Sequence, residues 1–283
     1  MNIGAVVAVA GWELRLAVRG RLVMGTAITF TIVCVAATLL GLRSLSDLGL
    51  AGVGPGTAAL INLAILFPPL MGLMLGANSL SSSRERGLLP LMLAQPISRL
   101  DLITGVVLGL VGAVWLTIGF GFGASAVLLA RVAGTADVGG LLAIVGSALG
   151  VGVVAVAVGV AISALAGSRL QALGLSMGLW FLFAFAIDLV LAGVGAAVHL
   201  GPFGLFVGVL LNPLEAGRVL MVLGSGGDAL TLGPFGAYLN DTVGTVGAAL
   251  AVCASLATWT GLSFLVAGAG LKRREPRAVS REP

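Results

Sequence analysis

Residues 81–105 read SSSRERGLLPLMLAQPISRLDLITG, a basic and amphipathic segment between two long apolar runs. The flanking runs, at about 57–80 and 102–130, are each long enough to form a helix across a bilayer core of roughly 30 Å. Charged side chains are costly in hydrocarbon, so the arginines of this segment belong at a membrane surface. The pattern therefore predicts two membrane-spanning helices joined by a short surface element, and this unit decides the fold class.

The composition of the whole chain indicates the same class. Hydrophobic residues make up 59% of the 283 positions, charged residues make up 9%, and the mean hydropathy is +1.15. A soluble domain carries about 25% charged residues, so this chain cannot cover an ordinary water-exposed surface. Its apolar runs lack the alternation of barrel strands, which favours helices. The sequence predicts an all-α integral membrane protein.

The apolar runs predict six transmembrane helices within one domain, 22–271, which a basic tail at 272–283 follows. The predicted spans lie at about 22–42, 57–80, 102–130, 138–166, 172–198 and 242–271. Residues 1–21 are predicted to form an interfacial helix, because Trp12, Arg15 and Arg19 share one helix face. The alternative is that this segment is a long polar start to the first span.

The region 199–241 does not fit a straight span. It contains two short apolar pieces, and an 11-residue helix rises only about 16 Å. Asn212, Pro213 and Glu215 separate the pieces, so one span through both would bury polar groups beside a proline. We expect re-entrant or surface-lying helices here, with Glu215 and Arg218 paired at i, i+3 spacing.

Positive charge is divided unequally between the two sides of this arrangement. One side carries 12 of the 15 lysine and arginine residues, and the other side carries 3. By the positive-inside rule, the first side and both termini are cytoplasmic, and the protein lies in the cytoplasmic membrane. The cytoplasmic set is Arg15, Arg19, Arg21, Arg84, Arg86, Arg99, Arg169, Lys272, Arg273, Arg274, Arg277 and Arg281; the outer set is Arg43, Arg131 and Arg218.

Small residues at four-residue spacing recur through the apolar runs and suit close helix packing in lipid. The pairs are Gly72/Gly76, Gly105/Gly109, Gly119/Gly123, Gly146/Gly150 and Gly174/Gly178. In a chain with 44 glycines several such pairs arise by chance. They therefore support helix packing without identifying which helices meet.

The segment 81–105 has the local signals of two helices with a break between them. Serines at 81–83 precede Arg84, Glu85 and Arg86, Gly87 interrupts the helix, and Pro96 with Ser98 and Arg99 begins the next one. Five apolar residues and two prolines fit a short amphipathic helix that offers side chains to a partner. An ordinary loop held at the lipid headgroups by its arginines is an equally weighted alternative on physical grounds alone.

The same residues resemble a known family. RERGLLPLMLAQPISRLDLITG at 84–105 is similar to the segment after the second span of ABC-2 type transporter permeases, where the coupling helix docks on an ATPase subunit. LNPLEAGR at 211–218 resembles a segment of the NosY-like subset, and VAGWEL at 9–14 resembles the opening of these permeases. Pro90 and Val106 depart from the family pattern. The resemblance implies that Arg84, Glu85, Arg86, Gly87, Pro96, Ser98 and Arg99 form the ATPase-coupling segment.

The chain has no phosphate-binding loop of its own. Lys272 is its only lysine and does not stand in a G-x-x-x-x-G-K-[ST] motif, so ATP and Mg²⁺ would be bound by a partner ATPase at the cytoplasmic face. The resemblance further implies a permease dimer, a partner protein at the outer face and contact with membrane lipid, and no nucleic-acid partner. We expect no cofactor within this chain. Reversing the charge of Glu85 or Arg86 is expected to abolish stimulated ATP hydrolysis while leaving membrane insertion intact.

Other candidate chemistry in the sequence is weak. Asp188, in the fifth span, is expected to pair with Arg218, to cap the re-entrant backbone, or to reach the outer interface. Gly174–Gly178 matches G-x-S-x-G, but His199, the only histidine, would lie about 34 Å along the same helix from Ser176. A single histidine also predicts no metal site, and we expect no catalytic residues.

Three functions remain open at this level. The first is a permease subunit that couples a separate ATPase to export of a substrate or to force transmission across the membrane. The second is a membrane anchor or scaffold for an outer-face partner. The third is an ATP-independent secondary transporter, which would show paired broken helices in internal repeats and several buried ionisable groups. Nothing in the sequence identifies a substrate.

Overall fold

The computed structural model describes residues 2–47, 54–93, 97–132, 138–186, 189, 201–225 and 242–273. Every regular element in this part of the chain is helical, as predicted. The elements are α1 (Ile3–Arg19), α2 (Arg21–Asp47), α3 (Gly54–Glu85), α4 (Leu88–Leu93), α5 (Arg99–Val132), α6 (Val138–Leu165), α7 (Arg169–Phe181), the π-helical turn η1 (Leu182–Ala186), α9 (Pro202–Leu211), α10 (Pro213–Gly224) and α12 (Thr245–Arg273).

Five of the described helices are long and apolar enough to cross a membrane: α2, α3, α5, α6 and α12. The predicted fifth span, 172–198, is described as α7 and η1 up to Ala186. Asp188 lies outside the described residues. The helices α9 and α10 meet at a bend of 111°, so this region is not a straight span. The all-α membrane fold predicted from the sequence is confirmed.

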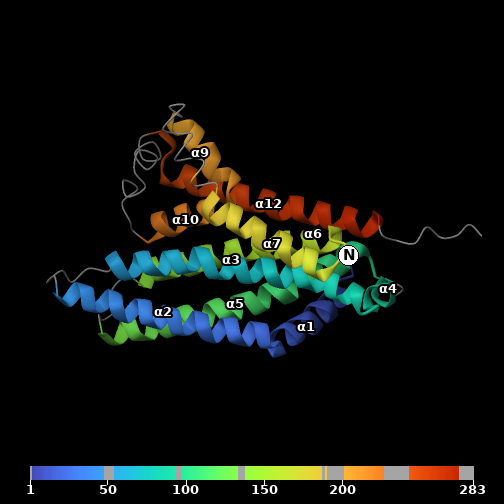
Figure 1. The fold of residues 1–283 in the computed structure, drawn as a ribbon. Coiled ribbons are helices and arrows are strands. Elements are labelled where there is room, and N and C mark those ends of the chain that lie inside the picture. The colour runs from blue at the N-terminus through green and yellow to red at the C-terminus, as the bar shows by residue number, and fades with distance from the viewer. Residues whose placement is uncertain are drawn as a thin grey trace, which may run out of the picture.

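Figure 1 shows the long helices side by side in one bundle, with α3 running through it. The turn after α3, the short helix α4, the start of α5 and the end of α12 lie at one end of the bundle, here called the α4 end. The bent pair α9 and α10 lies toward the opposite end. The helix α1 is separated from α2 by an extended residue, Gly20, and packs along α5 at the α4 end (Figure 1).

The contact between α3 and α6 is the largest in the bundle, and glycines make it close. A Cβ atom built on Gly76 would lie 2.5 Å from the carbonyl oxygen of Val156, and one built on Gly159 would lie 2.5 Å from that of Leu73. At these positions one backbone touches another, so no side chain can rotate away to make room. Gly72 adds a third close approach, to Ala155.

The predicted small-residue pairs differ in what they do. Gly105 and Gly109 face α1, where added Cβ atoms would meet Val9 and the backbone of Ala10. These two glycines and the pair at 72 and 76 therefore mark real helix contacts within the chain. The remaining pairs mark no such close approach among the described residues. Added Cβ atoms meet no described residue within 4 Å at Gly119, Gly123, Gly146, Gly174 and Gly178, and one on Gly150 lies at an ordinary contact distance, 3.9 Å, from Leu256.

Aromatic packing fixes α2 against the bundle. The ring of Phe30 is 1% exposed and lies 5.8 Å from the ring of Phe67 on α3 and 5.6 Å from that of Phe122 on α5. Gly121 on α5 leaves room for the Phe30 ring, because a Cβ atom on residue 121 would lie 2.5 Å from that ring. The packing holds α2, α3 and α5 together.

Candidate functional site

The predicted helix break at the α4 end is present. The helix α3 ends at Glu85, and Gly87 has a φ of +70°, a backbone conformation that glycine adopts without the strain of a Cβ. The amide of Gly87 donates to the carbonyl of Arg84 at 2.9 Å, which closes the turn. A six-residue helix, α4, follows, and the chain then enters α5. Pro96 lies outside the described residues.

Arg84 binds the end of a neighbouring helix. Its guanidinium donates to the carbonyl oxygen of Ala166 and to those of Ser163 and Ala164, at 3.3 and 3.5 Å. Ser163 and Ala164 lie in the last turn of α6 and Ala166 directly follows it, where the helix leaves its acceptors unsatisfied and carries partial negative charge. Arg84 therefore attaches the end of α3 to the end of α6.

Glu85 binds the start of the next helix. Its carboxylate accepts a hydrogen bond from the backbone amide of Arg169, with an oxygen-to-nitrogen distance of 2.7 Å. An acidic group is stabilising at a helix N-terminus, where free amides concentrate positive charge. The hydroxyl of Ser168 caps the same helix by accepting from the amide of Gln171 at 3.2 Å. Together, Arg84 and Glu85 hold the turn between α6 and α7 from both sides.

This arrangement gives two of the sequence-predicted coupling residues a role inside the chain. Their partners lie about 80 residues away, so the local pattern that indicated a docking surface could not reveal them. Reversing the charge of Glu85 would disturb the N-terminus of α7 in addition to any contact with a partner. A variant that tests docking alone must change a side chain that faces outward.

The short helix α4 offers such a side chain. Leu89 is buried in the core at 5% exposure, whereas Leu91 is 66% exposed. Its neighbour Met92 packs partly against the same core. The helix therefore has one apolar face inward and one apolar residue outward, which matches the amphipathic element that the sequence predicts. The sequence did not single out Leu91, because five of the six residues of α4 are apolar and only the fold distinguishes its two faces.

The start of α5 is fixed to α1. The amide of Asp101 donates to the hydroxyl of Ser98 at 3.1 Å, so Ser98 caps α5 as predicted. The carboxylate of Asp101 accepts from the backbone amide of Asn2 at 3.2 Å. Arg99 is the first residue of α5 and is half-buried. The α4 end is thus braced on α1 as well as on α6 and α7.

A buried carboxyl lies near this end on α1. Glu13 is 8% exposed and packs beside Gly109 of α5. Burial raises its pKa to about 7, and the positive charge of Arg86 opposes part of that rise. Arg86 itself is exposed and donates through Nε to the carbonyl of Ser82 at 3.2 Å. Glu13 can therefore change its charge near neutral pH.

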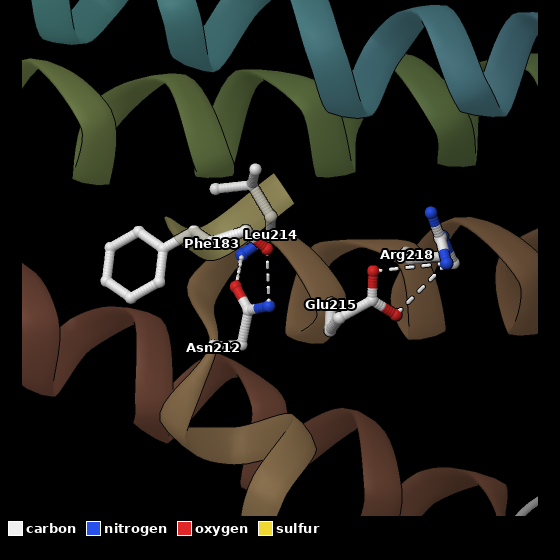
Figure 2. Close-up of polar contacts among 5 residues, drawn as sticks. All are labelled: Phe183, Asn212, Leu214, Glu215 and Arg218. Carbon is white, nitrogen blue, oxygen red and sulfur yellow. Dashed lines mark hydrogen bonds and ion pairs between the residues drawn. The ribbon is translucent and has the colours of Figure 1, made fainter. Parts of the chain in front are cut away.

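The second region singled out by the sequence is the bend between α9 and α10. Asn212 is fully buried, and its side-chain amide donates to the carbonyl of Phe183 at 2.8 Å (Figure 2). Its side-chain oxygen accepts from the amide of Leu214 at 3.1 Å and so caps α10. Pro213 then occupies the first turn of α10, where a missing N–H costs nothing. One residue thus joins the bend to the π-helical turn after α7.

The predicted ion pair beside this bend is confirmed. Arg218 Nη1 lies 3.1 and 3.2 Å from the two carboxylate oxygens of Glu215, one turn along α10 (Figure 2). Both residues belong to α10, so the pair stabilises this helix locally. The proposed pairing of Asp188 with Arg218 involves a residue outside the described part.

Asn212→Ala is expected to destabilise the folded chain by about 2–4 kcal/mol, because it removes a helix cap and leaves the buried Phe183 carbonyl without a donor. Asn212→Asp keeps the capping oxygen but places a carboxyl group against that carbonyl, so it should also destabilise. Thermal unfolding of the purified full chain measures both. The matched control is Thr258→Ala, which removes an exposed hydroxyl that bonds only its own helix at Ala254. Equal melting temperatures for Asn212→Ala and the control would contradict the proposed role.

The weaker chemical candidates do not assemble into a site. No group of three or more metal-ligating side chains occurs among the residues that the structure places. Ser176 is buried within the continuous helix α7, not on the strand-to-helix turn that a nucleophile elbow requires. Cys34 is buried and Cys253 is exposed, and both are free thiols.

Comparison with known proteins agrees with the geometry. A family model described as ABC-2 family transporter protein matches residues 7–267. The chain is 32% identical over 218 residues to the "Probable ABC transporter permease protein NosY" of Pseudomonas aeruginosa, an alignment that covers 75% of this chain and 79% of that protein. It is 29% identical over 272 residues to the protein of the same name from Stutzerimonas stutzeri, with 94% and 97% covered.

Proposed function

The chain belongs to the ABC-2 family of transporter proteins, and we propose that it is the subunit that couples ATP hydrolysis in a separate ATPase to movement of its own membrane helices. The ATPase docks at the α4 end, where α4 and the exposed side chain of Leu91 face it. ATP and Mg²⁺ are bound by that partner. This chain supplies the membrane path and the mechanical connection.

The attachment of Arg84 and Glu85 to the turn between α6 and α7 supports this proposal most directly. The helix α4 is joined covalently to α3 and α5, and these two side chains add non-covalent links to α6 and α7. A push on α4 therefore acts on four helices at once. The helix α3 has 32 residues and is about 48 Å long, so a small tilt at one end becomes a larger displacement at the other.

The direction of the coupling follows from charge. The side that holds the α4 end carries twelve of the fifteen cationic residues, so by the positive-inside rule this end faces the cytoplasm, where ATP is available. Both termini then lie on the cytoplasmic side of the cell membrane. The bend at Asn212 lies toward the outer surface, and α10 packs directly on α3 and α6. Movement of those two helices reaches the bend without an intermediate element.

The resemblance to NosY proteins favours a permease dimer with a partner protein at the outer face, to which the bent pair α9 and α10 would transmit movement. A scaffold that holds such a partner without ATP-driven motion is the second candidate, and the same bent pair of helices favours it. A secondary transporter is less well supported, since the described part holds one broken helix pair and no repeat of it.

Purification of the tagged full chain from its own membranes tests the proposal. We expect an ATPase chain that contains a phosphate-binding loop to purify with it, and the complex to hydrolyse ATP faster than the ATPase alone. Mass spectrometry identifies the partner, and phosphate release measures hydrolysis. If an outer-face protein purifies with the chain and no ATPase does, the scaffold function replaces the coupled permease.

A further inference from the structure

A cavity of about 390 Å³ lies at the α4 end, within the size range of small-molecule sites. Its wall comes from α1, the start of α2, α3, α5 and the start of α7. It is distinct from the outward face of α4 that carries Leu91. Its polar lining includes Glu13, Asn78, Ser82, Ser83, Arg86 and Arg169.

The wall that α3 contributes changes in chemistry along the helix. Met74, Asn78, Ser82 and Arg86 follow one another at four-residue spacing and therefore lie on one helix face. From Met74 to Arg86 this face passes from apolar through amide and hydroxyl to cationic, over about 18 Å. The sequence of groups matches the order met on passing from acyl chain through ester region to phosphate at a membrane surface.

Two arginines line the cavity. Arg86 comes from the end of α3 and Arg169 from the start of α7, and both side chains are exposed. Within the part of the chain that the structure describes, neither guanidinium forms an ion pair with a carboxylate. The side-chain oxygen of Asn78 is buried and has no hydrogen-bond partner among the described residues. The cavity lining therefore offers two guanidinium groups and one amide oxygen that can accept a hydrogen bond.

The charge of the cavity suits a single negative charge. Because burial raises the pKa of Glu13 to about 7, the lining carries a charge between +1 and +2 near neutral pH. A phosphodiester carries one negative charge and several acceptor oxygens, and a lining charge of +1 or +2 neutralises that negative charge. A protonated Glu13 also donates a hydrogen bond, whereas an ionised Glu13 repels the anion, so binding should weaken as the pH rises above 7.

We propose that this cavity binds the phosphodiester headgroup of a glycerophospholipid from the leaflet at the α4 end, with the phosphate between Arg86 and Arg169. The glycerol and ester groups lie along the serine level of α3. The acyl chains lie against Met74, Leu75 and Val23 at the apolar end of the lining. Trp12, which is 39% exposed beside the same cavity, suits the interfacial level of the bilayer. The proposal does not depend on an ATPase partner.

The lipid would act as a brace between α3, α7 and α1 at this level, in addition to the hydrogen bond that Glu85 already makes to the start of α7. Arg86 directly follows α3, Arg169 begins α7, and Trp12 and Glu13 belong to α1. A phosphate bound to both arginines joins the first two helices, and its glycerol region contacts the third. Loss of the lipid should therefore loosen α1 and α7 relative to α3.

Thermal unfolding of the purified full chain in a non-ionic detergent tests this site with phosphatidylglycerol as the probe. We expect saturating phosphatidylglycerol to raise the melting temperature of the wild type by about 4 °C. Arg86→Gln and Arg169→Gln should each lose most of that rise, and the double variant should lose all of it. The matched control, Arg15→Gln, removes an exposed cation of α1 that does not line the cavity and should keep the full rise.

Two further experiments distinguish a phospholipid from other ligands and test the role of Glu13. Inorganic phosphate should give no rise, because the apolar end of the cavity contributes to binding; a rise equal to that from phosphatidylglycerol would overturn the lipid assignment in favour of a free-phosphate site. Raising the pH from 6 to 8.5 should weaken lipid binding at least about threefold in the wild type and leave it unchanged in Glu13→Gln.

Native mass spectrometry of the same samples gives a readout that does not depend on stability. One tightly retained lipid per chain is expected in the wild type and in Arg15→Gln, and none in the double variant. Equal lipid retention by the wild type and the double variant, with equal thermal shifts, would refute the site.

Discussion

Gly76→Leu is expected to prevent the bundle from assembling, so that no folded chain accumulates in the membrane. A side chain at this position would enter the backbone of α6, because even a Cβ atom would lie 2.5 Å from the carbonyl oxygen of Val156 and 2.7 Å from the amide nitrogen of Val160. Overpacking a core commonly costs about 1–3 kcal/mol when side chains can adjust. Here only the separation of two helices relieves the clash, and this contact is the largest in the fold.

A graded series makes the prediction measurable. Gly76→Ala should fold with a lowered melting temperature, and Gly76→Leu should be lost from the monodisperse peak in size-exclusion chromatography of detergent extracts. Matched controls are Gly25→Leu on α2 and Gly119→Leu on α5, where an added Cβ meets no described residue within 4 Å. The packing account fails if Gly76→Leu elutes like these controls.

Leu91→Arg is expected to lower the stimulation of the partner ATPase at least about tenfold, without changing the fold of this chain. Leu91 is 66% exposed on α4, so the chain itself tolerates a charge there. At a docked interface the same arginine would be desolvated without a partner, and a penalty of about 1.4 kcal/mol already lowers binding tenfold. Stimulated phosphate release from the reconstituted complex is the measurement.

The control for this variant keeps the side chain apolar. Leu91→Met should retain stimulation, and the melting temperatures of the wild type, Leu91→Met and Leu91→Arg should agree. Full stimulation of the ATPase by Leu91→Arg would exclude this face of α4 as the docking surface. This variant separates docking from internal structure better than charge reversal at Glu85, because Glu85 caps α7 within the chain.

The sequence predicted the fold class well, for a specific physical reason. Long apolar runs can exist only where lipid surrounds them, so composition and run length alone identify the membrane helices. The break at Gly87, the cap at Ser98 and the pair of Glu215 with Arg218 were also predicted, since each depends on residues close together in the chain. The bend at Asn212 and Pro213 belongs with them.

Contacts between distant residues were not predictable in this way. Which of five small-residue pairs brings helices together depends on how each helix is rotated. Among the described residues, Gly72 with Gly76 and Gly105 with Gly109 are the pairs that make close approaches. The side-chain amide of Asn212 donates to the carbonyl of Phe183, which lies 29 residues away in the chain. Phe183 belongs to a π-helical turn, and no local sequence signal predicts that turn.

For the segment 81–105, the sequence by itself determined that it is a charged surface element between two membrane helices, because hydrocarbon excludes its arginines. Only the tertiary structure decided which of its residues bind other helices of the chain and which face outward. Arg84 and Glu85 turn inward to the ends of α6 and α7, Leu91 faces outward, and Arg86 borders the cavity beside Glu13. The reason is that a side chain's partner depends on where other helices end, and those positions are fixed only when the bundle packs.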